Sequence, residues 1–234
     1  MTERLDYLFE ESDILESVKS EINLGSYFHK RTDLHILRKL WHMGTGTFGL
    51  FCFFFFEVEK ENMTFFLLKL TVFAFIFDLV RIKFSRVNST VMFFMKPFMR
   101  GSEKKSLTGL PFYALGVTVS LILYQEKLAI LSIMFLVFSD PVSSFFGVLF
   151  GKQKILPNKT FEGCVAGYLT CYFLTLIYGF SLGVSGYNLF IFSILAGLIG
   201  MLAEAVSMGL DDNLTIPIIA GSGLTLLNLF IPVF

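Results

Sequence analysis

The feature that most constrains this fold is a series of apolar windows long enough to cross a lipid bilayer. A transmembrane helix needs about 20 predominantly apolar residues, and a mean hydropathy of +0.69 is unusual for a soluble domain. We therefore predict an all-α, polytopic membrane helix bundle with about seven transmembrane helices. The seven windows cover residues 43–56, 65–80, 107–124, 128–150, 162–180, 189–207 and 214–230, and the first is expected to continue back through residues 40–42.

The basic residues are unevenly divided between the two sides of this predicted bundle. The N-terminal segment and the loops after the second and fourth windows hold 16 of the 19 lysines and arginines. Cytoplasmic loops of membrane proteins carry an excess of Lys and Arg. The distribution predicts a cytoplasmic N-terminus and an external C-terminus, although the net charge is zero.

Two regions differ in composition. Residues 1–39 are polar, show no cleavable signal peptide, and carry apolar residues at helical spacing between residues 5 and 22, which predicts a cytoplasmic amphipathic segment. Residues 40–234 form the transmembrane domain. A short apolar patch at residues 91–99 is expected to be interfacial or re-entrant. Cys52, Cys164 and Cys171 all fall in predicted spans or their edges and are expected to be small core residues.

The fourth window carries an aspartate followed by a proline. Pro141 has no backbone N–H, so we expect the fourth span to break into two half-helices with Asp140 as N-cap of the second. A charge at membrane depth is costly and marks a functional-site candidate. Ser139, Ser143, Gly147 and Gly151 follow at four-residue spacing, so another helix or a ligand can approach this stripe closely. The alternative is a proline kink that serves helix packing alone.

The loop after the fourth window is rich in lysine. Lysine is a mobile positive charge suited to phosphate, and the N-terminal amides of the next helix favour an anion. Ordinary anchoring of a cytoplasmic loop is the alternative. The loop is not a P-loop, because Gln153 stands where that motif has Ser or Thr. The candidate binding residues here are Gly151, Lys152, Lys159, Thr160, Glu162 and Gly163.

Acidic residues gather where the sixth window ends and the seventh begins. Carboxylate oxygens suit Mg²⁺, which binds through one or two carboxylates together with substrate phosphates. Helix capping is the alternative, and it accounts for only one of the two adjacent aspartates. The candidates are Glu204, Asp211 and Asp212, followed by Asn213.

Two further clusters lie on the predicted cytoplasmic side. Arg38 and His42 share one helical face before the first window. They either anchor the helix at the membrane surface, as basic residues commonly do, or bind a second phosphate group. The basic loop around Glu103 suits anionic headgroups, and Asp78 and Arg81 are spaced to form an ion pair. All these clusters share one membrane face, although only Lys and Arg determined the orientation, which predicts one shared site. Charges crowded on one face disfavour a solute transporter, and we see no groove for nucleic acid.

Several motifs, taken in order, resemble one enzyme family. They are RKLWH at residues 38–42, EKKSLTG at 103–109, SDPVSSFFGVLFGK at 139–152, KTFEG at 159–163 and DDNLTIP at 211–217, seven residues after Glu204. The ordered set is similar to the CTP-dependent lipid kinases, which include dolichol (polyprenol) kinase, phytol kinase and the CTP-dependent diacylglycerol kinase. Part of it also resembles CDP-diacylglycerol synthase. Pro141 departs from the small residues found there in many relatives.

The resemblance implies an integral membrane enzyme that moves the γ-phosphoryl group of CTP to a lipid alcohol and leaves CDP. The distribution of Lys and Arg predicts that its site lies at the cytoplasmic face. It implies that Arg38, Lys39, Asp140 and Gly147 are needed for nucleotide use. It also implies that Lys152, Lys159, Thr160, Glu162 and Gly163 belong to the CTP site.

From this we expect Mg²⁺ to be held by Asp140 together with acids from Glu204 or the pair Asp211 and Asp212. Asp140 or a neighbouring acid is expected to take the alcohol proton, and the sequence does not choose between them. CTP:phosphatidate cytidylyl transfer is the nearest alternative reaction. The acceptor lipid and the oligomeric state, including a homo-oligomer, stay open.

Overall fold

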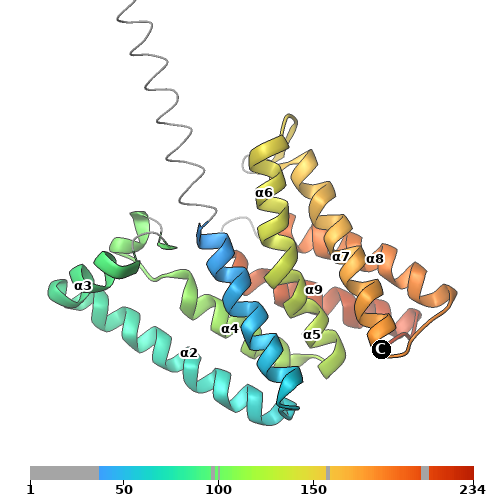
Figure 1. Cartoon of the computed structure of the whole chain (residues 1–234), viewed down its shortest axis with the longest axis horizontal. Coiled ribbons are helices and arrows are strands. Elements are labelled where there is room, and N and C mark those ends of the chain that lie inside the picture. Colours follow the sequence, from blue (N-terminus) through green and yellow to red (C-terminus); the bar gives the residue numbers. More distant parts are fainter. Residues whose placement is uncertain (1–36, 96–97, 100, 157–158, 207–210) are drawn as a thin grey trace, which may run out of the picture.

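The computed structural model describes residues 37–95, 98–99, 101–156, 159–206 and 211–234, so the predicted amphipathic segment lies almost wholly outside the described residues. A first helix is described over residues 37–55. The elements that follow are mostly helical (Figure 1). They are α2 (Lys60–Lys83), α3 (Ser85–Met95), the 3-10 turn η2 (Gly101–Lys104), α4 (Gly109–Leu123), α5 (Glu126–Met134), the π-helical segment η3 (Phe135–Ser139), α6 (Asp140–Phe150), β1 (Lys154–Leu156), β2 (Lys159–Thr160), α7 (Phe161–Ser181), α8 (Tyr187–Val206) and α9 (Asp212–Phe230).

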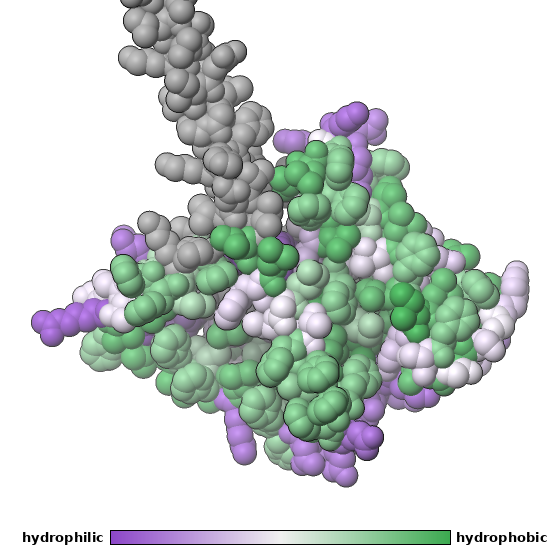
Figure 2. Space-filling view, in the orientation of Figure 1, coloured by the Kyte–Doolittle hydropathy of each residue, from purple (hydrophilic) through white to green (hydrophobic). Residues whose placement is uncertain are grey.

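The predicted all-α membrane bundle is confirmed. Among the described residues, five helices are long and apolar enough to cross a bilayer: α2, the continuous helix Glu126–Phe150, α7, α8 and α9. The apolar helix α4 is shorter. In Figure 2, apolar side chains cover much of the visible face and hydrophilic ones gather toward its edges. Every predicted window falls on a helix, while the number of seven spans and the orientation of the termini stay predictions.

The helix made of α5 and η3 lies at the centre of the bundle. Leu131, Phe135 and Leu136 are completely buried, because α4, α7 and α9 all pack around this segment. By contrast, α2 leaves a row of phenylalanines exposed, including Phe65 and Phe73. Burial of apolar side chains in the centre fixes the position of the segment that carries Asp140.

The predicted break in the fourth span is wrong. Asp140 has helical backbone angles (φ −60°, ψ −46°) and is not an N-cap. Its N–H bonds to the carbonyl of Phe135, five residues back, which is the π-helical pattern. The wider π turn lets the helix continue past Pro141, so α5, η3 and α6 form one helix of 25 residues. The sequence did predict the site of irregularity, but not its form.

Close helix packing brings the start of α9 against α4. A Cβ atom at Gly116 would lie 2.3 Å from the backbone oxygen of Asn213, so only glycine allows this approach. This contact holds the N-terminal end of α9 against the middle of α4, and Asn213 Nδ2 also donates to the Gly109 carbonyl at the start of α4, at 3.4 Å.

A short antiparallel hairpin joins α6 to α7, a feature that the prediction of an all-α chain did not include. β1 pairs with β2 so that Lys154 lies opposite Thr160. The apolar patch at residues 91–99 overlaps the end of α3, a helix with no buried residues. This exposure is compatible with the interfacial position expected for the patch, which stays a prediction.

Candidate functional site

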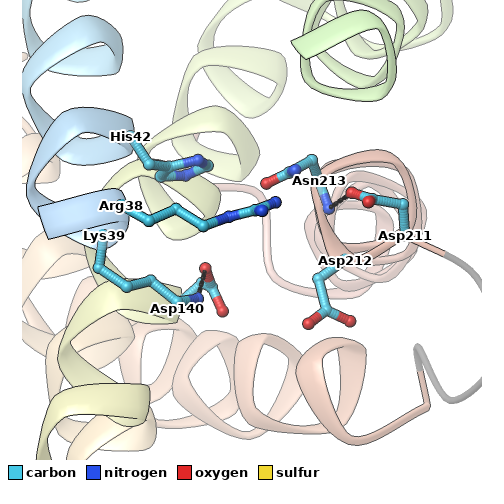
Figure 3. A pocket seen from close by; sticks show the side chains of 7 residues that line it. All are labelled: Arg38, Lys39, His42, Asp140, Asp211, Asp212 and Asn213. Atoms are coloured by element: carbon cyan, nitrogen blue, oxygen red, sulfur yellow. Dashed lines mark hydrogen bonds and ion pairs between the residues drawn. The ribbon is translucent and has the colours of Figure 1, made fainter. Parts of the chain in front are cut away.

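Side chains from three distant parts of the chain line one pocket. The first helix contributes Arg38, Lys39 and His42, the start of α6 contributes Asp140, and the start of α9 contributes three more. Figure 3 shows these side chains pointing toward one another from the three helices. The α9 residues are Asp211, Asp212 and Asn213.

Lys39 and Asp140 form the ion pair at the centre of this pocket. Lys39 Nζ donates to Asp140 Oδ2. The Asp140 side chain is 3% exposed, and its other oxygen, Oδ1, is buried without a hydrogen-bond partner in the structure. Leaving a buried carboxylate oxygen unsatisfied costs free energy. Asp140 therefore has one oxygen held by Lys39 and one available to a ligand.

Arg38 is held in a fixed position beside this pair. Its Nη1 donates to Glu103 Oε1 at 2.6 Å. A Cβ atom at Gly109 would lie 2.7 Å from Arg38 Nη2 and 2.9 Å from Asn213 Nδ2. The absence of a side chain at Gly109 thus makes room for the guanidinium between α4 and α9.

The loop that carries Glu103 is itself fastened by a buried network, and the predicted ion pair between Asp78 and Arg81 is confirmed at 3.0 Å. Arg81 is fully buried and also donates to the backbone oxygens of Glu103 and Ser106, at 3.0 and 2.8 Å. Asp78 Oδ2 accepts from the Thr108 N–H at 2.6 Å. The network connects α2 to the loop that positions Arg38.

The start of α9 has both a structural and a pocket-facing acid. Asp211 is the N-cap, and its side chain accepts from the Asn213 N–H at 3.0 Å. This matches the capping alternative, which accounted for one of the two aspartates. Asp212 lies in the first turn and lines the pocket. At the N-terminal end of α9, Asp212 therefore lines the pocket, while the N–H groups of Asn213 and Leu214 bond to Asp211.

A second ion pair lies next to the pocket. Lys159 Nζ donates to Glu204 Oε1 at 2.6 Å, and Ser143 Oγ donates to the same oxygen at 2.7 Å. Burial by itself lowers the pKa of Lys159, but the Glu204 carboxylate and the charges of Asp140 and Asp212 raise it above the ordinary lysine value. Lys159 therefore remains a cation at neutral pH. Glu204 is placed with Lys159 and is not among the side chains that line the pocket.

The stripe along α6 packs against α7. Ser139 Oγ donates to the Gly167 carbonyl at 3.1 Å. A Cβ atom at Gly163 would lie 2.9 Å from the Ser143 carbonyl, so the two helices approach closely. The sequence left open whether another helix or a ligand approaches this stripe, and in the structure it is another helix, α7.

Around this packing lie the remaining predicted nucleotide residues. Thr160 caps α7 by accepting from the Gly163 N–H at 3.3 Å, and Cβ atoms at Gly147 and Gly151 would lie 3.0 and 2.6 Å from Thr160 side-chain atoms. Lys152 is exposed on the loop, and Glu162 is half-buried at the start of α7. None of these six residues lines the pocket, so their predicted role in binding CTP stays a prediction.

The pocket can be tested for its fit to Mg²⁺. Among the described residues, no group of three or more His, Cys, Asp or Glu side chains is arranged to hold a metal ion. Mg²⁺, however, needs only one or two carboxylates when substrate phosphates supply further oxygens. Asp140 Oδ1, buried and without a partner, together with Asp212 across the pocket, fits that requirement.

The ion pair between Glu103 and Arg38 was not predicted from the sequence, because the two residues lie 65 positions apart in the chain. Gly109 was part of a motif, but its close approach to Arg38 was not predicted. An ion pair between residues as distant as Arg38 and Glu103 leaves no local spacing pattern in the sequence. The signal that existed was an acid inside an otherwise basic loop on the same predicted membrane face.

The chain is similar in sequence to several CTP-dependent diacylglycerol kinases. The chain is 32% identical over 161 residues to the CTP-dependent diacylglycerol kinase 1 of Schizosaccharomyces pombe, covering 63% of this chain and 72% of that protein. It is 24% identical over 226 residues to the protein of the same name from Saccharomyces cerevisiae, covering 87% and 76%. The Eremothecium gossypii protein of that name is also 24% identical, covering 87% and 69%. No solved structure matches the chain.

The resemblance to CTP-dependent lipid kinases is thus confirmed at the level of the family. Residues 23–207 match the cytidylyltransferase family, and this range includes Arg38, Lys39, Asp140, Lys159 and Glu204. The matched range covers most of the transmembrane bundle and four of the seven side chains that line the pocket. The chain belongs to the cytidylyltransferase family, together with its relatives among the CTP-dependent diacylglycerol kinases.

Proposed function

We propose that this protein is a CTP-dependent lipid kinase that transfers the γ-phosphoryl group of CTP to the hydroxyl of diacylglycerol and releases CDP. The observation that carries the proposal is the convergence of Lys39, Asp140 and Asp212, from three distant segments, in one pocket of an apolar helix bundle. The names of its relatives supply CTP and diacylglycerol. We place the site at the cytoplasmic face, because the basic loops gather there.

The protein's part in such a transfer is positioning and charge stabilisation. Arg38, fixed by Glu103, and Lys39, fixed by Asp140, would contact triphosphate oxygens. Lys159 remains cationic beside Glu204 and adds positive charge near the transferred group. The positive end of the α9 helix dipole also favours negative charge beside the start of that helix.

Mg²⁺ would be held by Asp140 and Asp212 together with phosphate oxygens, and when bound it would neutralise charge that develops on the triphosphate. Glu204 was a further candidate ligand. Its bonds from Lys159 and Ser143 favour a supporting position over direct coordination.

The proposal is tested with purified protein in mixed micelles. CTP and ATP, each labelled at the γ-phosphate, are offered with diacylglycerol, a polyprenol and phytol as separate acceptors. We expect label in the organic phase with CTP and diacylglycerol, at least about tenfold faster than with the other pairs, a difference of about 1.4 kcal/mol in the transition state. No label in any lipid would contradict the proposal, and a preference for polyprenol or phytol would correct the acceptor.

Cytidylyl transfer to phosphatidate is the second candidate, because the matched family is described as a cytidylyltransferase family. The two reactions leave different products. The kinase reaction leaves CDP, whereas cytidylyl transfer leaves pyrophosphate. Measuring both products in one reaction separates them.

A substitution at Gly109 tests the proposed role of Arg38. In Gly109→Ala, the new Cβ would meet Arg38 Nη2 at 2.7 Å and Asn213 Nδ2 at 2.9 Å, and both atoms are the far ends of side chains. The fold should therefore tolerate the change while the guanidinium moves. We expect KM for CTP to rise about tenfold, or about 1.4 kcal/mol of binding, with little change in the melting temperature.

Gly49→Ala is the matched control, because a Cβ there meets nothing within 4 Å. It should leave KM for CTP unchanged. An unaltered KM in Gly109→Ala would show that the position of the Arg38 guanidinium does not determine CTP binding.

A further inference from the structure

His42 lines the pocket, and neither the phosphate contacts nor the ion pairs described above use it. The ring comes from the first helix, one turn after Arg38 and Lys39. It packs edge-on against the ring of Tyr113 on α4, with centroids 4.8 Å apart and an interplanar angle of 82°. His42 Nε2 lies 3.1 Å from the backbone oxygen of Leu136 in η3. The ring is therefore held from two sides.

The irregular backbone at Pro141 explains why the Leu136 carbonyl is available to His42. In an α-helix this carbonyl would accept from the N–H of Asp140, but that N–H bonds to Phe135 instead. In the π-helical pattern it would accept from residue 141, and proline has no N–H. The π segment and the proline thus leave one buried backbone acceptor for the His42 ring.

This bond determines which ring nitrogen carries the proton. A carbonyl oxygen only accepts, so Nε2 must be the donor. In the neutral imidazole, Nδ1 then has the lone pair and can accept a proton. The backbone of η3 fixes both the orientation of the ring and its tautomer, as a basic group in an active site requires.

The other groups around the pocket are less suited to accepting a proton. Those that face His42 are Arg38 and Lys39 from its own helix, Asp140 from α6, Asp211 and Asp212 from α9, and Tyr113 from α4. Asp140 accepts a hydrogen bond from Lys39, and a carboxylate paired with an ammonium is a poor base. Asp211 caps α9. Asp212, in the site proposed above, would hold Mg²⁺ together with Asp140.

We propose that His42 is a further catalytic residue, which accepts the proton of the acceptor hydroxyl during phosphoryl transfer. The proposal rests on the kinase function proposed above. In the step, the alcohol O–H bond breaks and its proton moves to His42 Nδ1. The alcohol oxygen forms a bond to the γ-phosphorus of CTP, and the bond from that phosphorus to the bridging oxygen breaks. The leaving electron pair stays on the β-phosphate of CDP.

The test is the pH dependence of kcat in full-length wild-type protein and in His42→Gln, with γ-labelled CTP and diacylglycerol. The wild-type kcat should rise with pH across the range in which a histidine loses its proton. In His42→Gln we expect kcat to fall about 100-fold, KM for CTP to change less than about twofold, and the rise with pH to vanish. The glutamine amide can still donate to the Leu136 carbonyl, so the fold should persist.

Thr45→Ala is the matched control, because Thr45 is exposed on the same helix and its hydroxyl bonds only to that helix in the described structure. It should keep the wild-type profile. A second measurement uses an acceptor lipid that carries fluorine on the carbon next to the alcohol carbon. Fluorine makes the hydroxyl more acidic, so removal of its proton needs less help from a base. The loss of kcat in His42→Gln should therefore be smaller with this acceptor than with diacylglycerol.

Three outcomes would count against the proposal in different ways. If the wild type transfers no label, the kinase function itself is wrong, and the role of His42 with it. If the wild type transfers label and His42→Gln keeps more than a third of its kcat, or loses activity equally at every pH, His42 is not the proton acceptor. Should His42→Gln not fold, a wild-type kcat that is flat with pH would overturn the role.

Discussion

Asp140→Asn should lower kcat by about 1000-fold while the protein stays folded. The amide keeps the shape of the carboxylate but removes the charge that faces Lys39 and the available oxygen Oδ1. Removal of one group that stabilises transition-state charge typically costs 100- to 1000-fold in kcat, or about 2.7–4 kcal/mol. Lys39 is 26% exposed and can be hydrated when its partner is gone. The measurements are kcat with labelled CTP and the melting temperature.

Glu61→Gln makes the same chemical change at an exposed site in the first turn of α2. It should leave both quantities at their wild-type values. An Asp140→Asn protein with near-normal turnover would remove Asp140 from the mechanism, and the pocket would then need another metal-binding carboxylate.

Arg81→Met should produce the largest loss of stability among the substitutions considered. Arg81 is fully buried and bonds to Asp78, Asn88 and two backbone carbonyls. Removing one partner of a buried ion pair costs about 3–5 kcal/mol, because the other charge is left without compensation. We expect a free energy of unfolding lower by about that amount. The loop that carries Glu103 should loosen with it, so KM for CTP should rise as well.

Arg86→Met is the control for this change. Arg86 is exposed on α3, and the substitution there should alter the free energy of unfolding by less than about 0.5 kcal/mol. Equal effects of the two substitutions on stability would show that the buried network around Arg81 does not fasten the loop.

The broad architecture could be predicted because membrane helices leave a strong record in sequence. Each window of apolar residues corresponds to a helix, and the three-residue spacing of Asp78 and Arg81 predicted their ion pair correctly. Such features depend on local composition and spacing. The same is true of the acid that caps α9, for which Asp211 was one of two candidates.

Features that depend on contacts between distant segments could not be read in the same way. Pro141 predicted an interruption, but a proline is compatible with both a broken helix and a π turn, and packing around η3 decides between them. The serine and glycine stripe could have faced a ligand or a helix, and it faces α7. The partners of Arg38 and Lys159 lie 65 and 45 residues away, beyond any periodic pattern.

The fate of each phosphate of CTP tests the central claim most directly. CTP labelled at either the α- or the γ-phosphate is incubated with the purified protein, diacylglycerol and phosphatidate, and the label in extracted lipid is measured. If the pocket around Asp140 transfers a phosphoryl group, γ-label enters the lipid while α-label stays in water-soluble CDP. Label from the α-phosphate in the lipid, with pyrophosphate released, would contradict the kinase assignment.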